Sequence, residues 1–259
     1  MTLFKKMLAS AGIGAANVDL ILERDHVQAG ETIHGVVRIQ GGRVDQHVDD
    51  IYAFLKTRYI KEQSDSKVSV DATIAKYQLA GKFTVLAEQR YEFPVTMKLP
   101  DILPATIGKT PVWFQTGLDI KEAIDPQDND YLSVAPHPHV AVVLDAVQQM
   151  GFRMHEVSCK EVARRFRVDN IPFVQEFEFI PTAHYRNVLD ELEFMFYPNA
   201  SGIEMLVQID RRARGLSGWL AEAADMDESY VTIRFDRQEL ANGSSYIAQQ
   251  LAAHINKYT

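Results

Sequence analysis

The sequence contains a single cysteine, Cys159, among its 259 residues. One cysteine cannot form an intrachain disulfide, which fits folding in a reducing compartment. The sequence also lacks a paired CxxC, an HExxH motif and a phosphate-binding loop, three motifs that indicate redox, metalloprotease or nucleotide chemistry. We therefore interpret Cys159 as a small core residue. We predict no catalytic, cofactor-binding or metal-binding residues.

The chain is also poor in positive charge and in long apolar runs. It has 27 Lys and Arg against 35 Asp and Glu, a formal net charge of −8. General nucleic-acid binding needs a basic surface that neutralises phosphates. No run approaches the roughly 20 apolar residues that cross a bilayer. We therefore predict a cytoplasmic protein that binds no nucleic acid and does not insert into a membrane.

The first dozen residues leave three interpretations open. We favour a short amphipathic helix packed on the protein over a membrane-surface anchor or a cleaved signal peptide, because the apolar part is brief and diluted with serine and glycine. The residues concerned are Leu3, Phe4, Met7 and Leu8, with Lys5 and Lys6 between them.

Most of the chain alternates apolar and polar residues with the two-residue period of a half-buried strand. Repeated short strands with turn signals between them and few helices predict a mainly β fold with two sandwich domains. Pro94 lacks the N–H that a central strand needs, so we expect a bulge or a sheet edge there. The clearest runs are residues 31–40, 48–60, 83–99, 111–120, 173–179, 192–196, 203–209 and 230–235.

Helical spacing is confined to a few segments. It predicts helices over residues 140–150, 216–224 and 244–259, the last with an apolar stripe that we expect to face its own domain. Residues 125–130 combine turn formers with charge, which predicts an interdomain linker. We place the domains at residues 1–133 and 134–259.

Three groups of residues carry side chains that can bind a metal, but none of the groups has a complete set of ligands. The histidines and the cysteine lack further partners at a suitable spacing. The aspartates offer hard oxygens that suit calcium, but the glycine and distal glutamate of a helix–loop–helix calcium site are missing, so a solvated loop is the favoured interpretation. The groupings are His137 with His139, His155 with Cys159, and Asp125 with Asp128 and Asp130.

One basic cluster is unusual in this acidic chain. Arg211, Arg212 and Arg214 are followed by Trp219 in a glycine-containing segment. Arginine binds carboxylates and phosphates, and Arg and Trp are frequent at interface hot spots. We predict that these four residues form an interaction surface, which residues 164–167 join if the fold brings them together. Local ion pairing of the arginines, with the tryptophan in the core, is the simpler alternative.

Several segments resemble known families. Residues 27–39 and 49–55 resemble the amino-terminal arrestin domain, in which a Gly-Glu turn leads into a Gly-Val strand, and residues 115–126 continue that pattern. Further segments are similar, in the same order, to the bacterial stage-zero sporulation-control family. These are residues 4–16, 172–179, 189–193 and 210–216.

The resemblance implies two arrestin-like β-sandwiches in tandem, with no enzymatic activity and no obligate cofactor. It also implies a cytoplasmic regulatory role, linked in spore formers to entry into sporulation. We therefore expect a non-catalytic adaptor or scaffold that binds protein partners, with self-association left open. One rival is a trafficking-type protein recruited to anionic lipid through Phe4, Lys5, Lys6 and the segment 211–214. The other is a metal- or ligand-dependent enzyme built on residues 125–139.

Overall fold

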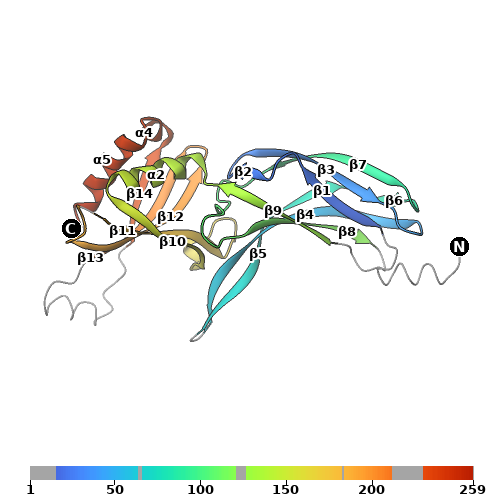
Figure 1. Ribbon diagram of the computed structural model, residues 1–259, viewed down its shortest axis with the longest axis horizontal. Coiled ribbons are helices and arrows are strands. Elements are labelled where there is room, and N and C mark those ends of the chain that lie inside the picture. The colour runs from blue at the N-terminus through green and yellow to red at the C-terminus, as the bar shows by residue number, and fades with distance from the viewer. Residues whose placement is uncertain (1–15, 64–65, 121–126, 183, 212–229, 259) are drawn as a thin grey trace. The chain divides into compact units, whose positions relative to one another are not determined.

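The structure, a computed structural model, describes residues 16–63, 66–120, 127–182, 184–211 and 230–258. Strands dominate it and helices are few (Figure 1), which confirms the mainly β prediction. Two compact units make up the chain. The first comprises Met1–Arg58, Val70–Thr106 and Pro111–Ala135, and the second comprises Tyr59–Ser69, Ile107–Thr110 and Pro136–Thr259. The predicted domain bounds, residues 1–133 and 134–259, remain a prediction.

The first unit is built from two sheets. One has the strand order β1-β3-β7, with antiparallel pairs throughout. In the other, β4 pairs with β5, β6 and β8, β9 pairs with β8, and the end of β9 pairs with β2. The strands are β1 (Asn17–Leu22), β2 (His26–Gln28), β3 (Thr32–Gln40), β4 (Gln46–Gln63), β5 (Ser66–Ala80), β6 (Phe83–Val85), β7 (Arg90–Lys98), β8 (Val112–Ile120) and β9 (Gln127–Ala135).

Strand alternation decides which side chains fill the core of the first unit. Ile51, Ala53, Leu55 and Thr57 of β4 are completely buried, and the residues that alternate with them are partly or fully exposed. On the other sheet, Val37 and Ile39 of β3 are also completely buried. Alternate apolar residues from both sheets form one cluster, as expected when two pleated sheets pack face to face.

Two details of this unit bear on the predictions. Pro94 lies in β7, an edge strand of the three-stranded sheet, so the expected edge is confirmed. The predicted linker is wrong for residues 127–130, which belong to β9. β9 pairs with β8 from Gln127 to Leu132. Ladder hydrogen bonds with a neighbouring strand have therefore outweighed the local turn preference of aspartate and asparagine.

The second unit contains one antiparallel sheet in the order β10-β11-β12-β13-β14. Helices α2 and α5 contribute to the same core as the sheet, and the stripe of Ile247, Leu251 and Ile255 is fully buried there. We expected a second sandwich, but among the described residues the layer against this sheet is helical. The elements are α2 (Pro138–Gln149), β10 (Phe152–Glu161), η1 (Arg164–Phe166), β11 (Phe173–Pro181), β12 (Leu189–Asn199), β13 (Gly202–Arg211), β14 (Tyr230–Asp236), α4 (Arg237–Ala241) and α5 (Ser244–Ile255).

The predicted helices at the N-terminus and over residues 216–224 lie outside the described residues. No described helix is both long and apolar enough to cross a bilayer.

Candidate functional site

The structure describes one of the four predicted interaction residues. Arg211 is exposed at the end of β13, opposite Leu189 of β12. Arg212, Arg214 and Trp219 lie outside the described residues. The predicted surface around them therefore remains a prediction.

Residues 164–167 are the other basic run in the sequence. They lie beside the start of β14. Arg164 and Arg165 are exposed in η1. The ring of Phe166 is 6.1 Å from that of Tyr230, the first residue of β14. The guanidinium of Arg165 lies 4.7 Å from the centroid of the Phe166 ring. The fold thus places residues 164–167 beside the first residue of β14.

The outer face of the larger sheet in the first unit carries a surface that sequence reasoning missed. Lys56, Trp113 and Tyr131 lie opposite one another on β4, β8 and β9. The Lys56 Nζ and the Arg58 Cζ are each 5.9 Å from the centroid of the Trp113 ring. The Trp113 and Tyr131 rings are 5.9 Å apart, and Tyr131 is 67% exposed.

The same pattern continues along β4. Lys76 of β5 places its Nζ 3.5 Å from the centroid of the Tyr52 ring and 5.4 Å from that of Phe54. Exposed cation–π contacts of this kind contribute about 0.5–1 kcal/mol each. Aromatic residues and arginine are enriched at protein interfaces. We call the whole set the aromatic–cationic face: Tyr52, Phe54, Lys56, Arg58, Lys76, Trp113 and Tyr131.

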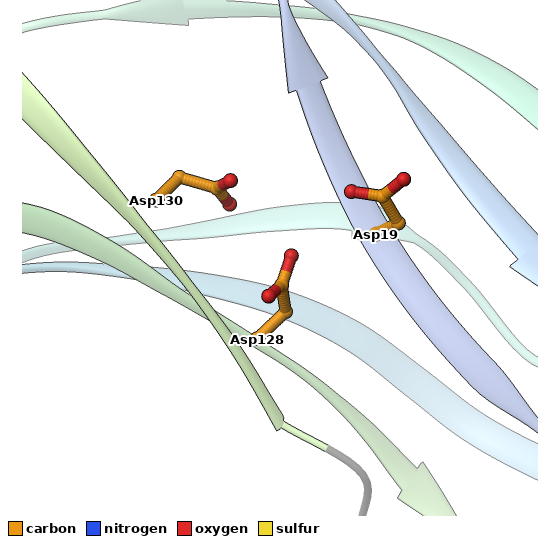
Figure 2. A group of neighbouring side chains, drawn as sticks. All are labelled: Asp19, Asp128 and Asp130. Carbon is orange, nitrogen blue, oxygen red and sulfur yellow. The ribbon is translucent and has the colours of Figure 1, made fainter.

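Two groups of carboxylates occur among the described residues. In the first unit, Asp19, Asp128 and Asp130 each place one oxygen within 4.8 Å of the others. Figure 2 shows the three carboxyl groups turned toward one another from β1 and β9. The other group is Glu178 with Glu191 and Glu193, on β11 and β12 of the second unit. Sequence reasoning grouped Asp128 with Asp130 but missed Asp19, which is remote in the chain.

A lysine acts electrostatically on two members of the glutamate group, Glu191 and Glu193. Lys160 of β10 forms an ion pair with Glu176, whose side chain is 6% exposed. Burial has the largest single effect and lowers the pKa of Lys160, but the hydrogen bond and charge of Glu176, together with the charges of Glu193 and Glu156, outweigh it and the pKa is raised. Burial, with the charge of Glu176, raises the pKa of Glu193 to about 7. This corner of the sheet is therefore a tightly coupled set of charges.

The histidine candidates have structural roles. His137 caps α2, its Nδ1 accepting a hydrogen bond of 3.2 Å from the backbone N–H of His139. The Nδ1 of His139 lies 3.1 Å from the carbonyl of Gly202. Neither histidine belongs to a group of three metal-ligating side chains within the described part of the chain.

Cys159 is buried, as predicted, and 3% of it is exposed. Burial raises the pKa of its thiol to about 12, although a hydrogen bond with Thr110 acts in the opposite direction. The thiolate is the reactive form of cysteine. We therefore expect maleimide to label the native protein at least about 100-fold more slowly than the urea-unfolded protein at mildly alkaline pH. Equal labelling rates, measured by mass spectrometry, would contradict this assignment.

The comparisons with known proteins cover nearly the whole chain. The family described as SpoOM protein matches residues 4–213. The sporulation-control protein spo0M of Bacillus subtilis (strain 168) is 43% identical over 241 residues, which is 93% of this chain and 93% of that protein. The crystal structure of Spo0M from the same species has a TM-score of 0.84 at 40% identity, covering 95% of this chain and 100% of that one. The chain therefore belongs to the SpoOM protein family.

Proposed function

We propose that this protein is a non-catalytic cytoplasmic regulator of sporulation or cell development that works as an adaptor, by binding other proteins. The observation that carries the proposal is 43% identity, across 93% of both chains, with a protein named for the control of sporulation. The alignment spans both compact units. The inferred regulatory role therefore rests on similarity to a whole protein rather than to one shared fragment.

The chemistry of the described residues supports a binding role over catalysis. The only thiol is buried, and its pKa of about 12 keeps it protonated. His34 and Thr96 are in contact, with the Nδ1 and the Oγ1 3.0 Å apart, but the pair is exposed on β3 and β7. An exposed pair lacks the water-excluded setting in which general acid–base groups work best.

Two surfaces of the protein suit docking. One is the aromatic–cationic face of the first unit. The other is the predicted surface of Arg211, Arg212, Arg214 and Trp219. Arg164 and Arg165 lie in η1, whose Phe166 contacts the start of β14. Arginine and aromatic side chains dominate interface hot spots. Both surfaces therefore suit docking to a protein partner.

Crosslinked capture of the tagged chain from its own cells, with partners identified by mass spectrometry, tests the proposal. We expect a few reproducible partners. One variant reverses Arg211, Arg212 and Arg214 to Glu, and a second combines Lys56→Glu with Tyr131→Ala. Loss of a docking hot spot costs at least about 2 kcal/mol, so one variant should bind its partner about 30-fold more weakly.

A control variant, Arg153→Glu, reverses an exposed charge on β10 outside both surfaces and should bind normally. All variants should keep the thermal midpoint of the wild type. A lower midpoint would mean that the changed residues stabilise the fold. Retained binding in both variants would reject the two surfaces, and recovery of the tagged chain alone would reject the adaptor role.

Recruitment to a membrane surface is the second candidate function, because the aromatic–cationic face also suits anionic lipid. Co-sedimentation with phosphatidylserine vesicles that Lys56→Glu with Tyr131→Ala abolishes would favour it. A protein that stays in the supernatant would reject it.

A further inference from the structure

Strands from the two sheets of the first unit lie side by side at one edge of the sandwich. β1 is an edge strand of the three-stranded sheet, and it contacts β9 of the other sheet. β9 pairs with β8 on one side, whereas only Ser133–Ala135 pair with β2. No described ladder joins β1 to β9, so side chains connect the two sheets here. Three of them are the carboxylates of Asp19, Asp128 and Asp130 (Figure 2).

Strand alternation turns two of these carboxylates inward. Asp128 and Asp130 share the parity of Leu132 and Val134, which are 6% and 3% exposed. Their side chains therefore lie on the core face of β9. Asp19 comes from β1, and Figure 2 shows its carboxyl group facing those of the other two across the space between the strands.

The described surroundings raise the energy of a charged Asp130. Its Oδ2 is buried and has no hydrogen-bond partner in the part of the chain that the structure describes. Burial, with the negative charges of Asp128 and Asp19, raises the pKa of Asp130 to about 6. Arg38 lies opposite Asp19 on β3, but its guanidinium donates to Glu92 at 2.9 Å. Like charges thus meet at a half-buried edge without a described cation that balances them.

An independent observation comes from the neighbouring strand. Thr116 of β8 has no exposed surface, and its Oγ1 has no hydrogen-bond partner among the described residues. Thr116 is the register partner of Asp128. Directly opposed residues of an antiparallel pair point to the same face with Cβ atoms about 4.5–5.5 Å apart. The unpaired hydroxyl therefore lies on the face that carries Asp128 and Asp130, and a buried hydroxyl without a partner is unfavourable.

We propose that Asp19, Asp128 and Asp130 bind one hard divalent cation, that Thr116 supplies a further oxygen, and that the cation ties β1 to β9. Calcium takes oxygen ligands at about 2.3–2.6 Å, so ligands on opposite sides of it stand about 5 Å apart. The three carboxylate oxygens lie within 4.8 Å of one another, which is close enough for one such ion to contact all three. Magnesium shares this oxygen chemistry but needs a tighter octahedron at about 2.1 Å.

The site departs from the expectation, drawn from the sequence, that the protein has no metal ligands. Asp128 and Asp130 were then placed in a solvated loop, and two carboxylates two residues apart make a poor site. β9 forms instead, and β1 supplies the third carboxylate. Carboxylate and hydroxyl oxygens favour calcium or magnesium over zinc or copper, which prefer imidazole and thiolate.

Calorimetric titration of the chelator-treated full chain with calcium chloride, and separately with magnesium chloride, tests the site. We expect one ion per chain with a dissociation constant between about 10⁻⁵ and 10⁻³ M, together with a rise of a few degrees in the thermal midpoint. Binding of calcium, of magnesium or of both with this stoichiometry supports the site and identifies the ion. No binding of either cation at about 10 mM would overturn it.

The variants locate the ion. Asp130→Asn and Asp19→Asn should each weaken binding at least tenfold and lose the cation-dependent rise in thermal midpoint. In chelator, Asp130→Asn should melt above the wild type, because it removes a repelling charge, so failure to fold is not expected. Glu191→Gln removes one carboxylate from the other acidic group and should bind like the wild type. Unchanged binding in both aspartate variants would place the ion elsewhere and overturn the proposal.

Discussion

Replacing Lys160 with methionine is expected to lower the free energy of unfolding by about 2–3 kcal/mol near pH 8, and by much less near pH 5. The lysine ammonium is paired with Glu176, whose side chain is 6% exposed. Removing one partner of a buried pair leaves the other charge without compensation. Because 39% of the Lys160 side chain is exposed, solvent screens part of this cost, and we expect less than a fully buried pair would show.

The pH dependence follows from the surrounding glutamates. The pKa of Glu193 is already raised to about 7, by burial and by the charge of Glu176, and Lys160 acts to lower it. Without the lysine, the pKa of Glu193 rises further. A carboxyl whose pKa is raised in the native state takes up a proton more readily there than in the unfolded chain. The loss of stability caused by the substitution is therefore fully developed above the raised pKa of Glu193 in the variant, and it disappears below the wild-type value of about 7.

Urea unfolding of the Lys160→Met variant at several pH values checks this expectation. The double variant with Glu176→Gln is the control, because removing both partners should recover much of the lost stability. A loss that does not change between about pH 5 and pH 8 would mean that the lysine acts through packing alone.

Replacing Phe194 with alanine is expected to cost about 3–5 kcal/mol of unfolding free energy. The Phe194 side chain has no exposed surface. Its ring stacks on Phe196 at 5.7 Å and meets Phe179 edge-on at the same distance. Alanine would leave a cavity between the sheet and the helices that form the core of the second unit. Aromatic pairs add about 0.5–1.5 kcal/mol to the loss of buried area.

Chemical denaturation of Phe194→Ala measures the effect. The matched control is Tyr131→Ala, which removes an aromatic ring that is 67% exposed. We expect the control to stay within about 0.5 kcal/mol of the wild type, as is usual for surface positions. A loss below about 1 kcal/mol in Phe194→Ala would contradict the packing described for this core.

The sequence by itself determined which side of each element faces the core. The parity of Ile51, Leu55 and Thr57 predicted a buried face of β4, and these residues are completely buried. The stripe of Ile247, Leu251 and Ile255 likewise predicted the inner face of α5. Both results depend on local geometry, since the side-chain direction repeats every two residues in a strand and every 3.6 in a helix.

The tertiary structure alone decided which faces and edges meet. Residues 127–130 looked like a linker, because the pairing of β9 with β8 is a long-range interaction that turn propensities do not contain. The helical layer of the second unit was missed for a similar reason. The amphipathic pattern of α2 and α5 predicted helices, but not that they cover the sheet in place of a second one.

The candidate sites also depend partly on the local sequence and partly on the tertiary structure. Lys56, Trp113 and Tyr131 lie on three separate strands, and only the register places them in one row. Asp19 met Asp128 and Asp130 only where β1 lies beside β9. Sequence periodicity determines a residue's face within its own element. The pairing of distant strands determines its neighbours, because register depends on the whole sheet.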